Sequence, residues 1–130
     1  MKETDPPCPC GNGQPYPACC ARWHAGPLHL QAPDAQALMR SRYSAYVLRL
    51  AEYLQDTWHP STRPAELSRQ EAGLQWLGLD VRRHVALDDS HATVEFVARS
   101  KLGGRAHRQH ETSRFVREGG RWYYVDGAVD

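Results

Sequence analysis

A short stretch near the start of the chain holds all four of its cysteines and restricts the fold more than any other feature. From Cys8 to Cys20 the spacing is C-x-C-x8-C-C, so two pairs of thiols are separated by eight residues. Four thiolates this close in sequence can surround one tetrahedral Zn²⁺, with Zn–S distances of about 2.3 Å. Gly11 and Gly13 suit the tight turn that must follow the first pair. We therefore predict one structural Zn²⁺ per chain, bound by Cys8, Cys10, Cys19 and Cys20.

Two other states of the cysteines compete with this prediction. One is a pair of disulfides, which would have to cross between the two cysteine pairs, and the other is four unrelated free thiols. Residues 1–7 are polar and lack the apolar segment of a secretory signal peptide, so we expect a cytoplasmic protein. Thiols stay reduced in the cytosol, and a cluster of reduced thiols favours metal binding over disulfides.

The cysteine stretch resembles the SEC-C motif, a zinc module found at the end of the SecA translocation ATPase. The resemblance rests on the Cys-Pro-Cys-Gly-Asn-Gly run at residues 8–13, on Tyr16 and on the closing pair Cys19-Cys20. It implies zinc as the metal, with Cys20 as the fourth ligand. The lysines that help the SecA module to bind acidic partners are absent from this stretch, so the resemblance does not imply that this chain binds the same partners.

Composition argues against two classes of partner. The chain has 16 Lys plus Arg against 15 Asp plus Glu, a net charge of +1, so no strong positive field favours nucleic acid. No apolar run approaches the length of a membrane span. The 130 residues allow one compact domain beside the cysteine module, and a hydrophobic content of 41% is enough for a core. We expect neither a nucleic acid nor a membrane as partner, and a monomer or a homodimer.

Helical patterns occupy the first half of the main domain. Apolar residues recur at three- and four-residue steps over residues 34–58, which predicts one long helix that Pro60 ends. A capping box at residues 68–71 predicts a second, short helix that ends at Gly78.

Strand patterns occupy the second half. From Leu79 onward the sequence alternates, and Gly103-Gly104 and Gly119-Gly120 are hairpin signals, so we predict a meander of four antiparallel strands. The predicted fold class is α+β, a curved antiparallel sheet packed on a long helix as a cone, with a small N-terminal zinc module. The domain boundaries that we predict are 1–25 for the module, 26–33 for a connector and 34–130 for the cone.

The chain as a whole resembles the YchJ family. The resemblance rests on three motifs in order: residues 37–46 (Ala-Leu-Met-Arg-Ser-Arg-Tyr-Ser-Ala-Tyr), residues 57–64 (Thr-Trp-His-Pro-Ser-Thr-Arg-Pro), and residues 110–127, where His-Glu-x-Ser-x-Phe precedes Gly-Arg-Trp-Tyr-Tyr-x-Asp-Gly. That family joins an N-terminal SEC-C motif to a middle domain similar to nuclear transport factor 2. The resemblance therefore implies a zinc module and a cone-shaped domain, and it implies no particular activity.

Cones of this family place polar groups in an aromatic cavity. The side chains that we assign to such a ligand pocket are Arg42, Trp58, His59, His110, Trp122 and Asp126. Structural roles are open to the same residues, because buried tryptophans belong to cores and Arg42 can form an internal ion pair. His110 and Glu111 are neighbours on a predicted strand, so only one of them can point into the cavity. We assign no catalytic residue.

Two classes of function follow. The first is a protein that acts by binding: a separately folded zinc module presents Tyr16, Arg22 and Trp23 to a protein partner, and the cone either dimerises or holds a small ligand. The alternative is a small isomerase- or dehydratase-like enzyme that uses the cone pocket. The sequence has no nucleophile motif and no phosphate loop, and four cysteines leave no open position on a zinc ion, which favours binding.

Overall fold

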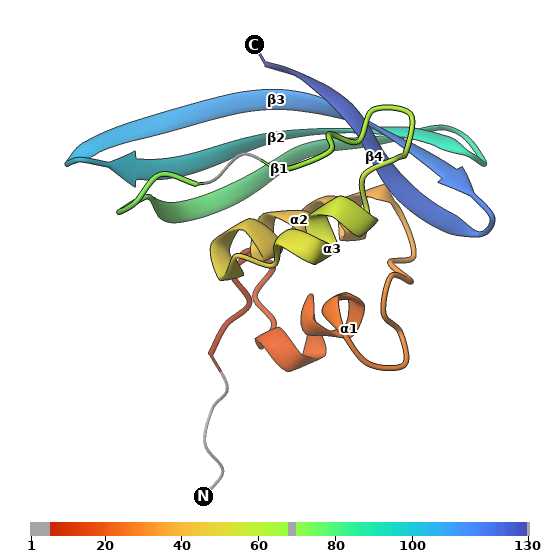
Figure 1. Ribbon diagram of the computed structural model, residues 1–130, viewed down its shortest axis with the longest axis horizontal. Helices are drawn as coiled ribbons and strands as arrows, with labels where there is room; N and C mark the ends of the chain where they lie inside the picture. Colours follow the sequence, from red (N-terminus) through yellow and green to blue (C-terminus); the bar gives the residue numbers. More distant parts are fainter. Residues whose placement is uncertain (1–5, 68–69, 130) are drawn as a thin grey trace, which may run out of the picture.

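The computed structural model, which describes residues 6–67 and 70–129, is a curved sheet lying across two helices, with the cysteine module on the other side of those helices (Figure 1). The strands form one antiparallel sheet in the order β1-β2-β3-β4, which confirms the predicted α+β class and the meander. The elements in chain order are η1 (Tyr16–Ala18), α1 (Ala21–His24), α2 (Ala35–Leu48), α3 (Ala51–Asp56), β1 (Gln75–Asp88), β2 (His91–Leu102), β3 (Arg105–Glu118) and β4 (Arg121–Val129).

The predicted long helix is two helices in the structure. Asp34 begins α2, because its side chain accepts a hydrogen bond of 2.7 Å from the backbone N–H of Ala37. Arg49 ends α2 in the left-handed conformation, with φ of 60°. The chain then turns back, and α3 runs beside α2 (Figure 1), so that Nη1 of Arg42 on α2 donates to the carbonyl of Leu54 on α3 at 2.8 Å. One continuous helix would separate these two groups.

The predicted short helix before Gly78 is wrong where the structure describes it. Residues 70–74 contain only a turn and β1 already begins at Gln75, whereas residues 68 and 69 lie outside the described part of the chain. Trp76 pairs with Ser100 of β2 and packs edge-on against Tyr43 of α2, with ring centroids 5.6 Å apart. Strand pairing and this aromatic contact override the local helical pattern.

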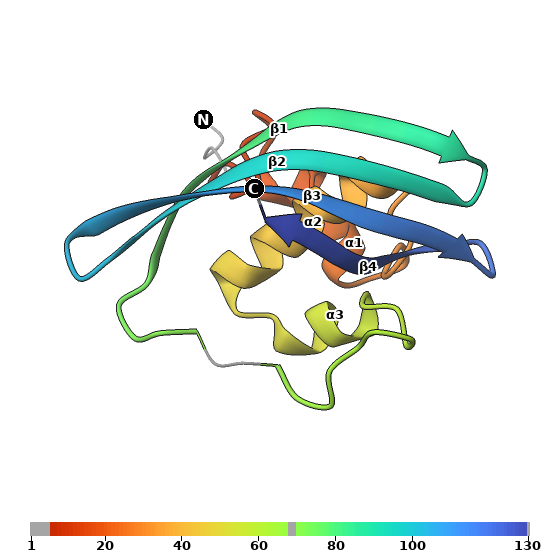
Figure 2. The same ribbon diagram turned by 90° about the horizontal axis from the view of Figure 1, so that it is seen from above.

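The core lies between the concave face of the sheet and α2. Alternate residues of β2, from Ala92 to Ala98, point to this face, and Phe115 of β3 joins them. Figure 2 shows the strands passing over the helices that cover this face. Most side chains on the other face are exposed or half-buried, as the period-two pattern of the strands predicts, and Val97 of β2 is a buried exception. Within the described residues, the structure contains no helix long and apolar enough to cross a membrane.

The cysteine module packs against α2 instead of standing apart from it. Nε2 of His24 lies 2.8 Å from the carbonyl oxygen of Ser41, and Nη1 of Arg40 donates to the carbonyl of Cys10 at 2.9 Å. Trp23 is only 7% exposed and belongs to the same core cluster as α2 and the sheet. The expectation that Trp23 is presented to a partner is therefore wrong: four helical residues of α1 cannot bury an indole, so it enters the neighbouring core.

Candidate functional site

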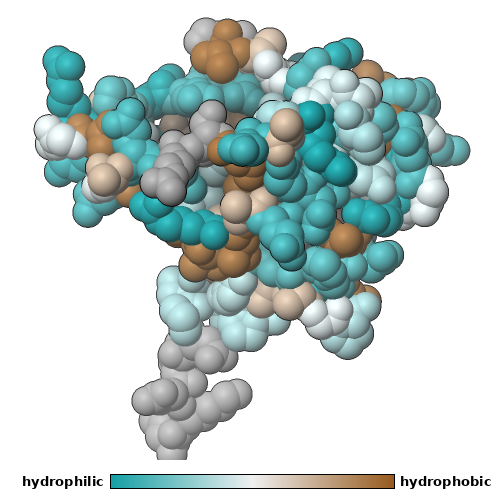
Figure 3. Space-filling view, viewed as in Figure 1, coloured by the Kyte–Doolittle hydropathy of each residue, from teal (hydrophilic) through white to brown (hydrophobic). Residues whose placement is uncertain are grey.

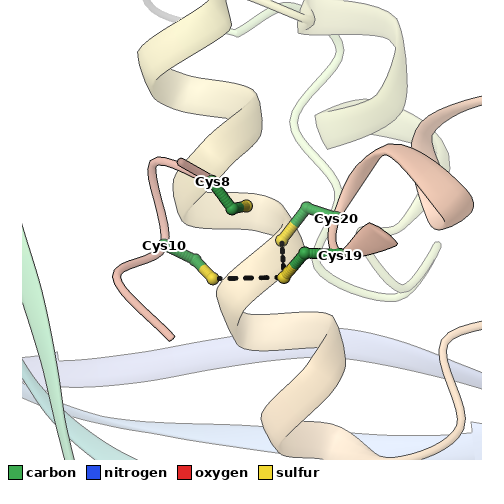
Figure 4. Close-up of side chains that lie close together, drawn as sticks. All are labelled: Cys8, Cys10, Cys19 and Cys20. Atoms are coloured by element: carbon green, nitrogen blue, oxygen red, sulfur yellow. Dashed lines mark hydrogen bonds between the residues drawn. The ribbon is translucent and has the colours of Figure 1, made fainter. Parts of the chain in front are cut away.

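The cysteine cluster is built from two short arms that meet in front of α2 (Figure 4). Cys8 and Cys10 precede a turn in which Gly11 and Gly13 have φ of 78° and 89°. The N–H of Cys8 closes this turn by donating to the carbonyl of Gln14 at 2.9 Å. The second pair lies at the junction of η1 and α1. Glycine tolerates this left-handed backbone, which explains why a turn rich in glycine separates the two pairs of ligands.

The four sulfur atoms have the spacing that a metal ion requires. All four lie within 4.8 Å of one another, and all four side chains are buried. The Sγ atoms of Cys10 and Cys19 are 3.6 Å apart, and those of Cys19 and Cys20 are 3.9 Å apart. Sulfurs at the corners of a tetrahedron with metal–sulfur bonds of about 2.3 Å lie about 3.8 Å apart. A disulfide would bring two sulfurs to about 2.05 Å, and all four cysteines are free. The cluster can therefore hold a metal ion.

Polar groups around the cluster suit a negatively charged metal–thiolate site. The hydroxyl of Ser44 on α2 lies 3.5 Å from Sγ of Cys8. Nε of Arg22 donates to the carbonyl of Cys19 at 2.9 Å, and Arg40 reaches the carbonyl of Cys10 from α2. A divalent ion with four thiolates carries a net charge of −2, so two guanidinium groups next to the ligands favour it. These contacts also tie the ligand-bearing arms to α2.

The thiols of the cluster have strongly unequal acidities. Hydrogen bonds from the neighbouring thiols of Cys10 and Cys20 lower the pKa of Cys8. Hydrogen bonding within the same cluster raises the pKa of Cys20, and burial raises the pKa of Cys19 to about 11. The thiols of Cys19 and Cys20 therefore hold their protons more firmly than ordinary cysteines do, because several thiolates repel one another in a buried site. A bound cation has to displace these protons, so affinity for metal must fall as the pH falls.

A second candidate site is a cavity of about 420 Å³ between α2 and the concave face of the sheet. Arg42, one of the six residues that we assigned to a ligand pocket, lines it. Trp58 lies behind Arg42, with its ring centroid 5.2 Å from the guanidinium carbon, and packs edge-on against Tyr124. Trp122 is partly buried and packs against the core. Of the six residues that we assigned to one pocket, only Arg42 lines this cavity.

His110 and Asp126 lie on the solvated face of the sheet. Nε2 of His110 is 2.6 Å from a carboxylate oxygen of Glu95, and Nε of Arg114 donates to Asp126 at 2.6 Å. Side chains on a strand alternate between the two faces, so the placement of Glu111 in the cavity turns His110 outward. The structure therefore does not bring His110 and Asp126 together with Arg42.

His59 lies at yet another place. It follows Trp58 in the loop after α3, where its Nε2 is 3.0 Å from a carboxylate oxygen of Glu118. Its ring packs edge-on against Tyr123, with centroids 5.6 Å apart. The side chain thus helps to fasten this loop to the sheet, away from the cavity that Arg42 lines.

Our assignment of six pocket residues left out Glu111, which we had weighed as the alternative to His110, and Tyr124; both line the cavity. Nε2 of Gln109 and the hydroxyl of Ser113 each donate to the Glu111 carboxylate at 2.8 Å. Gly127 on the neighbouring strand leaves room for this carboxylate, because a Cβ at that position would overlap it. Strand parity could have identified the set: residues 109, 111 and 113 share a face with the buried Phe115.

Comparisons with known proteins agree with this architecture. The family model described as "YchJ, middle NTF2-like domain" matches residues 34–127. A UPF0225 protein from Bordetella pertussis is 62% identical over 122 residues, which cover 94% of this chain and 92% of that protein. A UPF0225 protein from Methylibium petroleiphilum is 58% identical over 129 residues, which cover 99% of this chain and 93% of the relative.

Two solved structures are similar over nearly the whole chain. The solution structure of a SEC-C motif containing protein from Rhodopseudomonas palustris has a TM-score of 0.82 and 33% identity, covering 95% of this chain and 98% of that one. The crystal structure of a SEC-C motif containing protein from Psychrobacter arcticus has a TM-score of 0.76 and 30% identity, covering 95% of this chain and 82% of that one.

Proposed function

This chain belongs to the YchJ family of SEC-C motif proteins with an NTF2-like middle domain, and from that premise we propose that it is a zinc-binding protein that acts by binding partners. The observation that supports zinc is the set of four buried sulfurs at the spacing of a tetrahedral site. Four free thiols also suit a reducing compartment, and we propose the cytoplasm as its location.

The proposed zinc ion is structural. Four cysteine ligands complete a tetrahedron, so no position remains for water or a substrate, and zinc in such a site does not take part in a reaction. A segment as short as residues 6–24 cannot bury a core of its own, and metal binding supplies folding free energy to modules of this kind. In this chain the metal would hold the two ligand-bearing arms against α2.

Native mass spectrometry tests the zinc assignment. We expect one zinc ion per chain at neutral pH in protein purified without chelator, and loss of the ion as the pH falls to about 5 and below. The reason is that protons compete with the metal for thiolates, so acid can only weaken binding. The double variant Cys8→Ser/Cys10→Ser should carry no metal at any pH. Bound iron, metal retained by the double variant, or two disulfides in protein kept reduced would contradict the assignment.

We propose a protein partner for the exposed side of the module. The cysteines and Trp23 face inward, so this side consists of the turn at residues 11–14 together with Pro17, Ala18 and Arg22. The face of the molecule seen in Figure 3 is mostly hydrophilic, with small and separate hydrophobic patches. Such a surface suits a reversible interaction with a polar rim more than a permanent apolar interface.

A matched pair of substitutions tests this docking surface. Ala18 of the module and Ala86 of β1 are both exposed, so Arg can be placed at either without disturbing the core. We expect Ala18→Arg to retain zinc and to lose at least about 30-fold in affinity for a protein captured by the unmodified chain, since a bulky charge at an interface centre costs about 2 kcal/mol. Ala86→Arg should bind normally. Equal binding by both variants would contradict the proposed surface.

We also propose that the cone cavity takes a small molecule. Arg42 lines this cavity together with Tyr43, Tyr46 and Tyr124. The volume of the cavity is within the range of small-molecule sites, about 300–1,000 Å³. A small isomerase- or dehydratase-like enzyme would need an acid and a base in one cavity. His110 and Asp126, the histidine and the aspartate of the predicted pocket, lie instead on the opposite face of the sheet, where they contact Glu95 and Arg114, which favours binding over catalysis.

A further inference from the structure

Arg42 is a buried cation that has no anionic partner among the described residues. The residue is 3% exposed. Its Nη1 donates to two neutral acceptors, the carbonyl of Leu54 at 2.8 Å and the hydroxyl of Thr57 at 2.7 Å. Within residues 6–67 and 70–129, no carboxylate lies at ion-pair distance from this guanidinium. Burying an unpaired charge costs several kcal/mol. An anion that entered the cavity would offset part of that cost.

Aromatic residues other than Trp58 form walls of the cavity, and aromatic rings contact the guanidinium. Its central carbon lies 4.4 Å from the ring centroid of Tyr124 and 5.2 Å from that of Trp58. Tyr43 of α2 and Trp76 of β1 both line the cavity and pack edge-on, with ring centroids 5.6 Å apart. Cation–π contacts stabilise a buried guanidinium but do not neutralise it. Flat walls of this kind favour a planar ligand over a branched one.

Glu111 supplies a fixed acceptor in the same cavity. Gln109 donates to one of its carboxylate oxygens and Ser113 to the other, which holds the group in one orientation over Gly127. Each oxygen keeps a lone pair for a further donor. Tyr124 contacts Arg42, and its pKa, which burial raises to about 12, responds to the charges of both Glu111 and Arg42.

The entrance of the cavity is hydrophilic and exposed, whereas its floor is buried. His107, Arg108 and Val129 are exposed lining residues at the end of the β2–β3 hairpin and of β4. Arg42 and Ser113 are buried lining residues. A small solute can therefore enter from this end and reach the guanidinium. Arg108 adds a positive charge near the opening, which favours the approach of an anion.

We propose that this cavity binds a small planar carboxylic acid that carries a hydroxyl or amino group at its other end. Arg42 receives the carboxylate, Glu111 accepts a hydrogen bond from the donor group, and the aromatic walls enclose the planar body. This inference rests on the small-molecule pocket proposed above and adds the chemical class of its ligand. The supporting feature is one cavity that contains an unpaired buried cation and an oriented carboxylate.

A series of probes on the unmodified full-length chain tests the class without relying on a variant of Arg42. In ¹H–¹⁵N NMR titrations, we expect 4-hydroxybenzoate to shift the backbone amides of Arg42, Glu111 and Tyr124 in a saturable way. The corresponding amide, 4-hydroxybenzamide, should bind at least about tenfold more weakly, because an ionised acceptor makes the stronger hydrogen bonds to a guanidinium. Benzoate, which lacks the hydroxyl donor, should bind about fivefold more weakly than 4-hydroxybenzoate.

A matched pair of carboxylate variants tests the role of Glu111. Glu111 and Glu95 lie on adjacent strands, but Glu111 lines the cavity and Glu95 pairs with His110 on the solvated face. In Glu111→Gln, the preference for 4-hydroxybenzoate over benzoate should shrink to less than about twofold, because the charged acceptor is gone. In Glu95→Gln, the fivefold preference should remain. An unchanged preference in both variants would overturn the assignment of Glu111.

The remaining outcomes separate the ligand class from the pocket itself. If 4-hydroxybenzamide binds in the cavity as tightly as 4-hydroxybenzoate, the pocket exists and the proposed acid class is wrong. If none of the three probes shifts amides lining the cavity at millimolar concentration, both the ligand class and the proposed pocket are wrong. If saturable shifts map to the solvated face instead, the cavity is not the site.

Discussion

Chelation of the metal is expected to lower the Tm of the whole chain by more than 10 °C. Zinc binding contributes about 10–16 kcal/mol to small zinc modules, and a loss of even 3 kcal/mol shifts the Tm of a domain of this size by about 10 °C. The loss of stability should extend to the cone, because two residues of α2 contact the cysteines. Ser44 lies next to Sγ of Cys8, and Arg40 donates to the carbonyl of Cys10. Thermal unfolding followed by circular dichroism, with and without a zinc chelator, measures the shift.

Two controls make this first prediction specific. Readdition of Zn²⁺ should restore the original Tm, and the metal-free variant Cys8→Ser/Cys10→Ser should not respond to the chelator. A Tm that changes by less than about 2 °C in protein shown to be metal-free would mean that the cysteine arms fold without the ion. In that case the cluster would not have the structural role that we propose.

Replacement of Trp23 by Ala is expected to destabilise the entire protein by about 3–5 kcal/mol while leaving zinc in place. Truncation of a large buried aromatic side chain lowers the free energy of unfolding by this amount, because the hydrophobic stabilisation of the side chain is lost and an unfilled cavity remains. Trp23 is 7% exposed and belongs to the core cluster that includes Leu38 of α2 and Phe115 of β3. Urea unfolding, followed by the fluorescence of the remaining tryptophans, gives the free energy of unfolding.

Leu28 is the matched control for Trp23. It lies five residues further along the same segment but is 48% exposed, so Leu28→Ala should change the free energy of unfolding by less than about 1 kcal/mol. A single cooperative transition that moves as a whole in Trp23→Ala would show that module and cone unfold together. A separate, unshifted transition of the cone would instead show that the two parts are independent, contrary to the packing of Trp23.

The close packing of the module on α2 links the two proposed roles of the protein. Arg42, which lines the cavity, is flanked on the same helix by Arg40 and Ser44, which contact the cysteine arms. Helix α2 therefore has the metal cluster on one side and the cavity on the other. Metal loss is expected to disturb the cavity through this helix, and the NMR titrations described above can be repeated on the chelated chain to detect it.

Features that depend on neighbouring residues could be predicted from the sequence. The spacing of the four cysteines brings the thiols together almost regardless of the rest of the chain, because the members of each pair are at most one residue apart and a short segment joins the pairs. The two Gly-Gly pairs lie at positive φ in the hairpins that connect the strands. The four-stranded meander and the α+β class follow from such local signals.

Features that depend on contacts between distant segments were decided by the tertiary structure. Arg49 adopts a left-handed conformation, and the helix ends there. The break lets α3 turn back along α2, and this arrangement is stabilised by the hydrogen bond from Arg42 to the carbonyl of Leu54. Trp76 lies in a strand because β2 and Tyr43 provide its partners.

The contents of the cavity are the clearest case of this division. Alternation along β3 shows that His110 and Glu111 point to opposite faces, but it does not say which of them faces the helices. That choice depends on the register of β3 with β2, which places Glu111 opposite Phe96 on the concave face and His110 opposite Val97 on the other. A shift by one residue would exchange the two side chains. The sequence by itself therefore determined the cysteine cluster and the sheet, whereas strand register and helix packing decided which polar groups share the cavity.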